Sequence, residues 1–114
     1  MAIGVGEGDA VFVPSFTFVA TAEVVSLLNA TPFFVDVDMQ TFNIDPAKLR
    51  DAIIASKKMG LTPRVIIPVD LFGQPACYEE INEIAKEFSL NVISDAAQSF
   101  GARQGDKSVG GLAH

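Results

Sequence analysis

Short apolar runs alternate along this chain with segments of helical periodicity. The runs, rich in β-branched and aromatic residues, lie at 10–14, 33–38, 64–70 and 90–95, and the periodic segments lie at 19–28, 46–58 and 78–88. A helix between two strands makes the connection a crossover, so the strands it joins run parallel. The pattern therefore predicts an α/β fold, a three-layer α/β/α sandwich around a mainly parallel sheet.

Proline and glycine set several of the expected boundaries. Asp45 followed by Pro46 is typical of a helix start, because the aspartate caps free backbone N–H groups and proline tolerates the first helical position. Gly60 predicts the end of that helix. Pro68 cannot donate to a β-ladder, so pairing of the third strand is expected to give way near it.

Composition narrows the class of protein. The chain has 114 residues, 49% of them hydrophobic, which suits one domain with a core. Its net charge of -6 argues against a nucleic-acid partner, which would need clustered Lys and Arg. No signal peptide and no run of roughly 18 apolar residues is present, so we expect a cytoplasmic protein without a membrane partner.

The single cysteine and the single histidine offer little chemistry. Cys77 has no partner for an internal disulfide, and a buried or idle thiol is expected. His114 is the last residue, and we expect it to be frayed. No pair of His or Cys residues predicts a transition-metal site.

Polar residues close the apolar runs, at Pro14, Asp38, Asp70 and Asp95. The carboxyl ends of parallel strands meet at one edge of a sheet, where open α/β sheets bind ligands. Asp95 is the most informative of these residues, because an amide at Gln98 follows it three positions later. By position alone, however, an aspartate after a strand is more often a turn or capping residue than a functional one.

The glycines at 4, 6 and 8 do not predict a phosphate site. They precede the first strand, whereas a dinucleotide-binding fingerprint lies between a strand and the following helix, and their spacing also differs. We interpret this segment as a loop. No Walker-type Gly-Lys-Ser/Thr sequence occurs in the chain either.

Four blocks of sequence resemble the DegT/DnrJ/StrS sugar aminotransferases, which are pyridoxal-phosphate enzymes of fold type I. The blocks are GDAVFVPSFTFVAT at 8–21, TPFFVDVD at 31–38, IPVDLFGQPA at 67–76 and DAAQSFGA at 95–102. They occur in the family's order, which is more specific than any single block. The resemblance implies pyridoxal 5'-phosphate as the cofactor of the parent enzyme.

The resemblance assigns roles to individual residues. Asp95 matches the aspartate that hydrogen-bonds the cofactor's pyridine nitrogen, and Gln98 matches the Gln or His at the phenolic oxygen. Phe18 matches the aromatic residue that stacks on the pyridine face, although a core aromatic at a helix start is the alternative interpretation. Asp70 and Gln74, at another strand tip, either line the pocket or cap the next helix.

Other parts of the family pattern have no match. The Ser-Gly-Thr block that holds the cofactor phosphate, the Schiff-base lysine and the small C-terminal domain are all absent from the 114 residues. Lys107 is not that lysine, and we expect it to be a solvated charge. The chain is thus expected to be a partial domain, the central part of the large domain, inactive and at best a weak cofactor binder in isolation.

Three hypotheses about function follow. The first is a piece of an aminotransferase, expected to be a homodimer, that acts on a keto-sugar nucleotide with a glutamate-type amino donor. A sugar dehydratase, in which histidine replaces the lysine, is a variant within the same family. The second is a non-catalytic α/β module that self-associates or binds a partner through exposed strand edges. The third is a flavodoxin-like nucleotide-binding domain, supported by the βα repeats alone.

Overall fold

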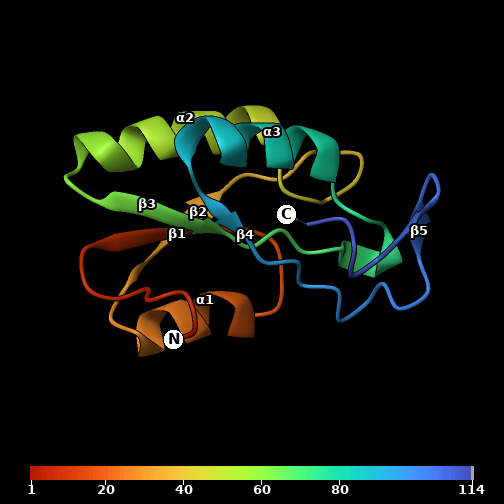
Figure 1. Ribbon diagram of the computed structural model, residues 1–114, viewed down its shortest axis with the longest axis horizontal. Helices are drawn as coiled ribbons and strands as arrows, with labels where there is room; N and C mark the ends of the chain where they lie inside the picture. Colours follow the sequence, from red (N-terminus) through yellow and green to blue (C-terminus); the bar gives the residue numbers. More distant parts are fainter. Residues whose placement is uncertain (114) are drawn as a thin grey trace.

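Four parallel strands form the centre of the molecule in the computed structural model, which describes residues 1–113. The strands are β1 (Asp9–Pro14), β2 (Thr31–Val35), β3 (Thr62–Ile66) and β4 (Asn91–Val92), in the order β2-β1-β3-β4 (Figure 1). Each neighbouring pair is parallel. This confirms the predicted α/β class.

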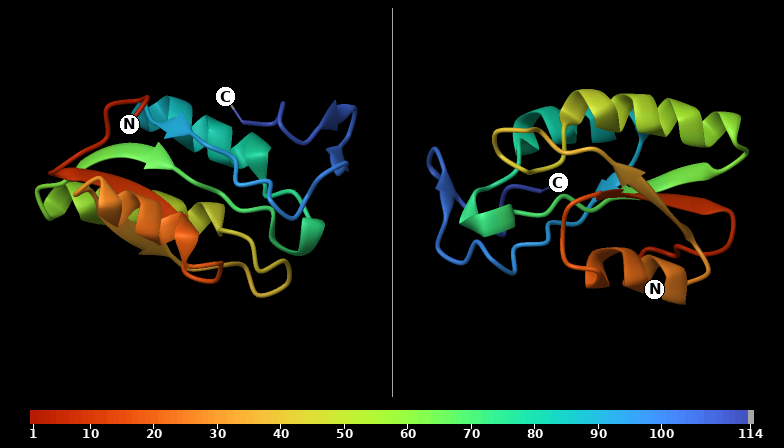
Figure 2. Two further views of the ribbon diagram at one scale, coloured as in Figure 1. Left: turned by 90° about the horizontal axis from the view of Figure 1, so that it is seen from below. Right: turned by 180° about the vertical axis from the view of Figure 1, so that it is seen from behind.

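Helices cover both faces of the sheet. The helices α2 (Pro46–Lys58) and α3 (Tyr78–Phe88) lie on one face, and α1 (Ala20–Leu27) lies on the other (Figure 1). The view from behind in Figure 2 shows the same separation into three layers. Helices therefore pack on both faces of the sheet, as expected where crossover helices connect parallel strands.

The central strand β1 shows why the sheet is buried on both sides. Ala10 and Phe12 belong to the larger core cluster, under α2 and α3, whereas Val11 and Val13 belong to the smaller cluster that packs against α1. All four residues are buried. Side chains alternate between the two faces of a strand, so a continuous apolar run is what a doubly covered strand requires.

Three of the four strands, β2, β3 and β4, are shorter than the apolar runs that predicted them. β2 ends at Val35 instead of residue 38, and β3 ends at Ile66 instead of residue 70. Pro68 explains the second difference, because it has no N–H to continue the ladder. Beyond β4, an isolated bridge between Val69 and Asp95 is the next pairing. The helices begin and end within one residue of their expected bounds.

Residues after β4 form a small antiparallel hairpin of β5 (Arg103–Gln104) and β6 (Lys107–Ser108). A short 3-10 turn from earlier in the chain, η1 (Leu71–Gly73), lies near this hairpin (Figure 1). Leu112 then returns to the larger core cluster. Within residues 1–113, no helix is both long enough and apolar enough to cross a membrane.

The expected helix start at Asp45 offers a test of the fold. The Asp45 carboxylate accepts hydrogen bonds from Ala47 N (2.8 Å) and Lys48 N (3.4 Å), and Pro46 follows it. Asp45→Ala should therefore lower the free energy of unfolding by about 1 kcal/mol, measured by urea denaturation. Asp51→Ala, at an exposed position on the same helix, is the control. Equal effects of the two substitutions would contradict the capping role.

Candidate functional site

The ends of β3 and β4 bring Asp70 and Asp95 together. Asp70 N–H donates to the Asp95 carbonyl (3.0 Å), and Asp95 N–H donates to the Pro68 carbonyl (2.9 Å). The two residues are therefore paired through the backbone at the carboxyl edge of the sheet. This places Asp95 at a strand end, as the sequence pattern predicted.

The Asp95 carboxylate is half-buried and oriented by its neighbours. Its Oδ2 accepts a hydrogen bond from the Thr21 hydroxyl of α1 (3.1 Å), and its Oδ1 accepts a longer one from Ala97 N (3.3 Å). Thr21 is itself buried, and its N–H donates to the Phe18 carbonyl (3.2 Å). A carboxylate oxygen accepts two hydrogen bonds, so Oδ1 and Oδ2 retain capacity for a ligand.

Thr21 is the residue of this site that sequence reasoning missed. It lies 74 residues before Asp95, and nothing in its local sequence distinguishes it from other helical threonines. The one available signal was its position, because it follows Phe18 by three residues and so lies in the first turn of α1. Contact with Asp95 depends on α1 packing against the sheet, which no local pattern encodes.

The side chain of Gln98 is exposed, and only the oxygen of its amide is hydrogen-bonded among the described residues. Its Oε1 accepts a hydrogen bond from Phe72 N–H in η1 (2.7 Å). Within residues 1–113, Nε2 makes no hydrogen bond, so the amino group is free to donate outward. A Cβ on Gly73 would lie 3.2 Å from the Gln98 carbonyl oxygen, and Gly73 has φ +83°, so glycine suits this close approach of the two loops.

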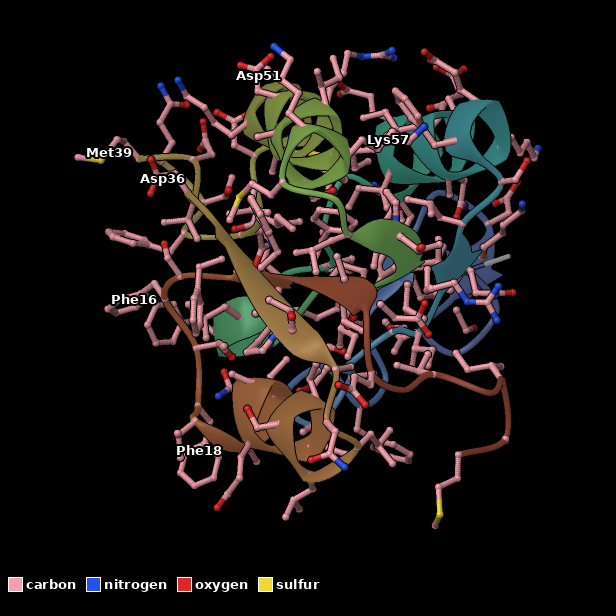
Figure 3. The ribbon with its side chains drawn as sticks, turned by 90° about the vertical axis from the view of Figure 1, so that its left-hand side faces the viewer. Phe16, Phe18, Asp36, Met39, Asp51 and Lys57 are labelled. Carbon is pink, nitrogen blue, oxygen red and sulfur yellow. The ribbon has the colours of Figure 1, made fainter. Side chains whose placement is uncertain are left out.

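Phe18 lies at the surface, immediately before α1. Its side chain is 74% exposed, so the alternative interpretation as a core aromatic is wrong. Figure 3 shows Phe18 beside α1 and Phe16 on the same flank of the molecule. The ring is therefore available to cover a flat ligand, and its backbone is joined through Thr21 to the Asp95 carboxylate.

Asp70 does not line a pocket, which corrects one of the two interpretations from sequence. The residue is 0% exposed. Its carboxylate accepts hydrogen bonds from Ala76 N (3.0 Å), the Tyr78 hydroxyl (2.8 Å) and the Ser99 hydroxyl (2.8 Å). Gln74 is exposed, and its backbone carbonyl accepts a hydrogen bond from Asn43 Nδ2 (2.9 Å).

Tyr78 is buried beside Asp70, and its hydroxyl also contacts the Ser94 hydroxyl. Burial raises the pKa of Tyr78 above its ordinary value, and the Asp70 carboxylate adds to this effect because it disfavours a second negative charge. The phenol is therefore expected to stay protonated in the folded chain under conditions in which an unfolded chain ionises.

This shift predicts a pH dependence of stability. Below pH 10 the contribution of Tyr78 to the stability of the fold is fully present. Above pH 10 the tyrosine loses its proton in the unfolded state but keeps it in the folded state. The free energy of unfolding therefore falls by up to about 1.4 kcal/mol per pH unit. Tyr78 is the only tyrosine and tryptophan is absent, so tyrosinate absorbance reports on this residue alone. Tyr78→Phe should remove this part of the dependence. If Tyr78 ionised at the same pH in the folded chain and in the urea-unfolded chain, the raised pKa of the folded state would be wrong.

The remaining residues singled out from sequence lie away from Asp95. Lys107 is exposed in β6, as expected of a solvated charge. Cys77 is exposed instead of buried, although partial burial and the nearby Glu80 raise the pKa of its thiol. His114 falls outside the described residues.

A pocket in the part of the chain that the structure describes also lies away from Asp95. It has a volume of about 600 Å³, lies between α3 and the β5–β6 hairpin, and does not include Asp95, Gln98 or Phe18. Among its lining residues, Asn82 donates through Nδ2 to the Leu112 carbonyl (2.8 Å). The candidate site is instead an open surface at the carboxyl edge of the sheet.

Comparison with known proteins identifies the family. The family model of the DegT/DnrJ/EryC1/StrS aminotransferases matches residues 1–114. The chain belongs to this family. The match confirms the resemblance that the four sequence blocks indicated, and it favours the first of the three functional hypotheses.

Individual family members are closely similar. The chain is 54% identical over 104 residues to the UDP-2-acetamido-2-deoxy-3-oxo-D-glucuronate aminotransferase of Pseudomonas aeruginosa, covering 90% of this chain and 27% of that protein. A DegT/DnrJ/EryC1/StrS aminotransferase from Brucella abortus matches in structure with a TM-score of 0.86 and 55% identity, covering 88% of this chain and 27% of that one. The 114 residues thus span about a quarter of the length of these relatives.

A third relative carries a cofactor. NtdA of Bacillus subtilis, solved with bound cofactor PMP, matches with a TM-score of 0.78 and 37% identity, covering 88% of this chain and 22% of that one. The chemistry of the residues around Asp95 fits a pyridine-ring cofactor of this kind. Asp95 offers a carboxylate, Gln98 offers an outward N–H donor, and Phe18 offers an exposed aromatic face.

Proposed function

We propose that this chain is the central part of the large domain of a pyridoxal-phosphate aminotransferase that acts on a keto-sugar nucleotide with a glutamate-type amino donor. Family membership and the nucleotide-sugar relative support the reaction class. The observation that carries the proposal is the Asp95 carboxylate at the strand end, held by the Thr21 hydroxyl, with Gln98 beside it.

Asp95 would hold a proton on the pyridine nitrogen of the cofactor. A carboxylate at hydrogen-bonding distance favours the protonated ring, and a charge-assisted hydrogen bond of this kind is stronger than a neutral one. When bound, the cofactor supplies an electron sink for the carbanion formed at the substrate. Thr21 would keep the carboxylate oriented, because its hydroxyl already occupies one lone pair of Oδ2.

Gln98 and Phe18 would orient the ring. Because Phe72 N–H holds the Gln98 oxygen, the Nε2 amino group is the end that faces a ligand and can donate to the phenolic oxygen. The Phe18 ring would cover one face of the cofactor, adding dispersion and excluding water from it.

Three parts of the proposed enzyme lie outside the 114 residues. They are the Ser-Gly-Thr block for the phosphate, the lysine that holds the cofactor covalently, and the small C-terminal domain. We therefore propose that the 114-residue chain alone is inactive. The same reasoning makes Lys107 a surface residue of the enzyme, consistent with its exposure in β6.

The proposal is tested with the complete polypeptide that contains this segment. Incubated with pyridoxal phosphate, it should acquire the cofactor's near-ultraviolet absorption, which should survive gel filtration. With ¹⁵N-labelled glutamate and a keto-sugar nucleotide, mass spectrometry should find the label in the sugar. A polypeptide without cofactor absorption would contradict the proposal, and a dehydrated, unlabelled sugar would indicate the dehydratase variant.

Exposed aromatic residues favour self-association as a second property, and we propose that the enzyme is a homodimer. Phe16 and Phe42 have ring centroids 5.6 Å apart, and Phe42 and Phe72 have centroids 6.4 Å apart. All three side chains are at least 40% exposed. Sedimentation of the chain and of Phe72→Ser tests association directly: a monomer at all concentrations would argue against it.

A further inference from the structure

We propose that the buried carboxylate of Asp70 is a positioning group that anchors the segment 95–99 and so fixes the directions of Asp95 and Gln98. The inference rests on the proposed function, because it concerns how the cofactor-binding segment is held. Asp70 itself touches no ligand, since its side chain is 0% exposed.

The hydrogen bonds of Asp70 come from three parts of the chain. Its Oδ1 accepts from Ala76 N (3.0 Å) in the loop before α3 and from the Tyr78 hydroxyl (2.8 Å) in that helix, and its Oδ2 accepts from Ser99 Oγ (2.8 Å). A buried carboxylate is costly unless its lone pairs are satisfied, and three donors meet that need. The loop, the helix and the segment 95–99 are thereby tied to one group.

The segment is held at both of its ends. The Asp70 N–H donates to the Asp95 carbonyl (3.0 Å), and the Asp70 carboxylate accepts from Ser99, which is 2% exposed. Between these points Gln98 reaches Phe72 N–H (2.7 Å), two residues after Asp70. A segment anchored in this way loses less conformational entropy when a ligand binds, so binding is tighter than to a free loop.

The geometry predicts which substitution at position 70 is tolerated. In Asp70→Asn, the amide oxygen can take the place of Oδ1 and keep both of its donors. The amide nitrogen would then donate to Ser99 Oγ, whose proton can turn to the Ala96 carbonyl, already 3.3 Å away. Asparagine should therefore preserve the anchoring, whereas Asp70→Ala and Ser99→Ala remove it.

Amide hydrogen exchange on the 114-residue chain, followed by NMR, tests the anchoring without any cofactor. In Ser99→Ala, exchange of the Phe72 amide and of the backbone amide at position 99 should accelerate about tenfold, while amides in the middle of α2 remain unchanged. Asp70→Asn should stay within about threefold of the unsubstituted chain. Ser26→Ala, which removes an exposed hydroxyl from α1, is the matched control and should change none of these amides.

The outcomes separate the inference from the function on which it rests. Unchanged exchange in Ser99→Ala, or equal losses in Asp70→Asn and Asp70→Ala, would overturn the positioning role. Pyridoxamine phosphate at millimolar concentration should shift the Asp95 and Gln98 resonances of the unsubstituted chain, and more weakly those of Ser99→Ala. Anchoring that fails while these shifts persist overturns the inference alone, whereas intact anchoring together with a complete polypeptide that acquires no cofactor absorption overturns the proposed function.

Discussion

Replacing Asp95 with asparagine in the complete polypeptide, the proposed aminotransferase, should lower kcat/KM roughly tenfold to a hundredfold. The neutral amide cannot supply the charge-assisted hydrogen bond to a protonated pyridine nitrogen, which is worth about 1.5–3 kcal/mol. The substitution should largely preserve the surroundings, because the asparagine oxygen can still accept from the Thr21 hydroxyl and only the longer hydrogen bond from Ala97 N (3.3 Å) is lost. Steady-state kinetics with the keto-sugar substrate measures the loss.

Asp51→Asn is the matched control for the loss of charge. Asp51 is exposed on α2, and Figure 3 shows it at the opposite end of the molecule from Phe18. The control should change kcat/KM less than twofold. If Asp95→Asn were also within twofold of the unsubstituted enzyme, the assignment of Asp95 to the cofactor would be wrong.

Phe12→Ala should lower the free energy of unfolding of the chain by about 3–5 kcal/mol. Phe12 is 0% exposed on the central strand β1, and its ring centroid lies 5.7 Å from that of Phe33. Truncation removes apolar burial and leaves a cavity between the sheet and α2. Small domains are stabilised by only about 5–15 kcal/mol, so the variant should unfold at much lower urea concentration.

Phe34→Ala, on the neighbouring strand β2, is the control for this substitution. Phe34→Ala removes the same side-chain atoms as Phe12→Ala, but Phe34 is 57% exposed. Its effect on the free energy of unfolding should stay below about 1 kcal/mol. Circular dichroism monitors the unfolding of both variants. Similar losses in the free energy of unfolding would mean that the core is not where the structure places it.

Much of the fold was predictable because its signals are local. Helical spacing and the Asp45-Pro46 start gave α2 its bounds, and continuous apolar runs indicated strands buried on both faces. The lengths of the strands were less predictable. β3 ends at Ile66 although apolar residues continue, because pairing depends on neighbouring strands and on the missing N–H of Pro68.

The site was predictable to a smaller extent. The position of Asp95 at a strand end followed from the pattern of runs, since parallel strands place their carboxyl ends together. Its partner Thr21 could not be found, because the contact joins residues 74 positions apart through packing of α1. The burial of Asp70 likewise depends on donors from separate parts of the chain, so sequence alone left its role open between pocket lining and capping.

The central claim is that Phe18, Asp95 and Gln98 form the part of the cofactor site carried by this chain. The most direct test is a titration of the ¹⁵N-labelled 114-residue chain with pyridoxamine phosphate, followed by chemical-shift changes. We predict concentration-dependent shifts confined to 18–21, 71–74 and 95–99. Shifts centred on the pocket between α3 and the β5–β6 hairpin, or spread without preference over the chain, would contradict the claim.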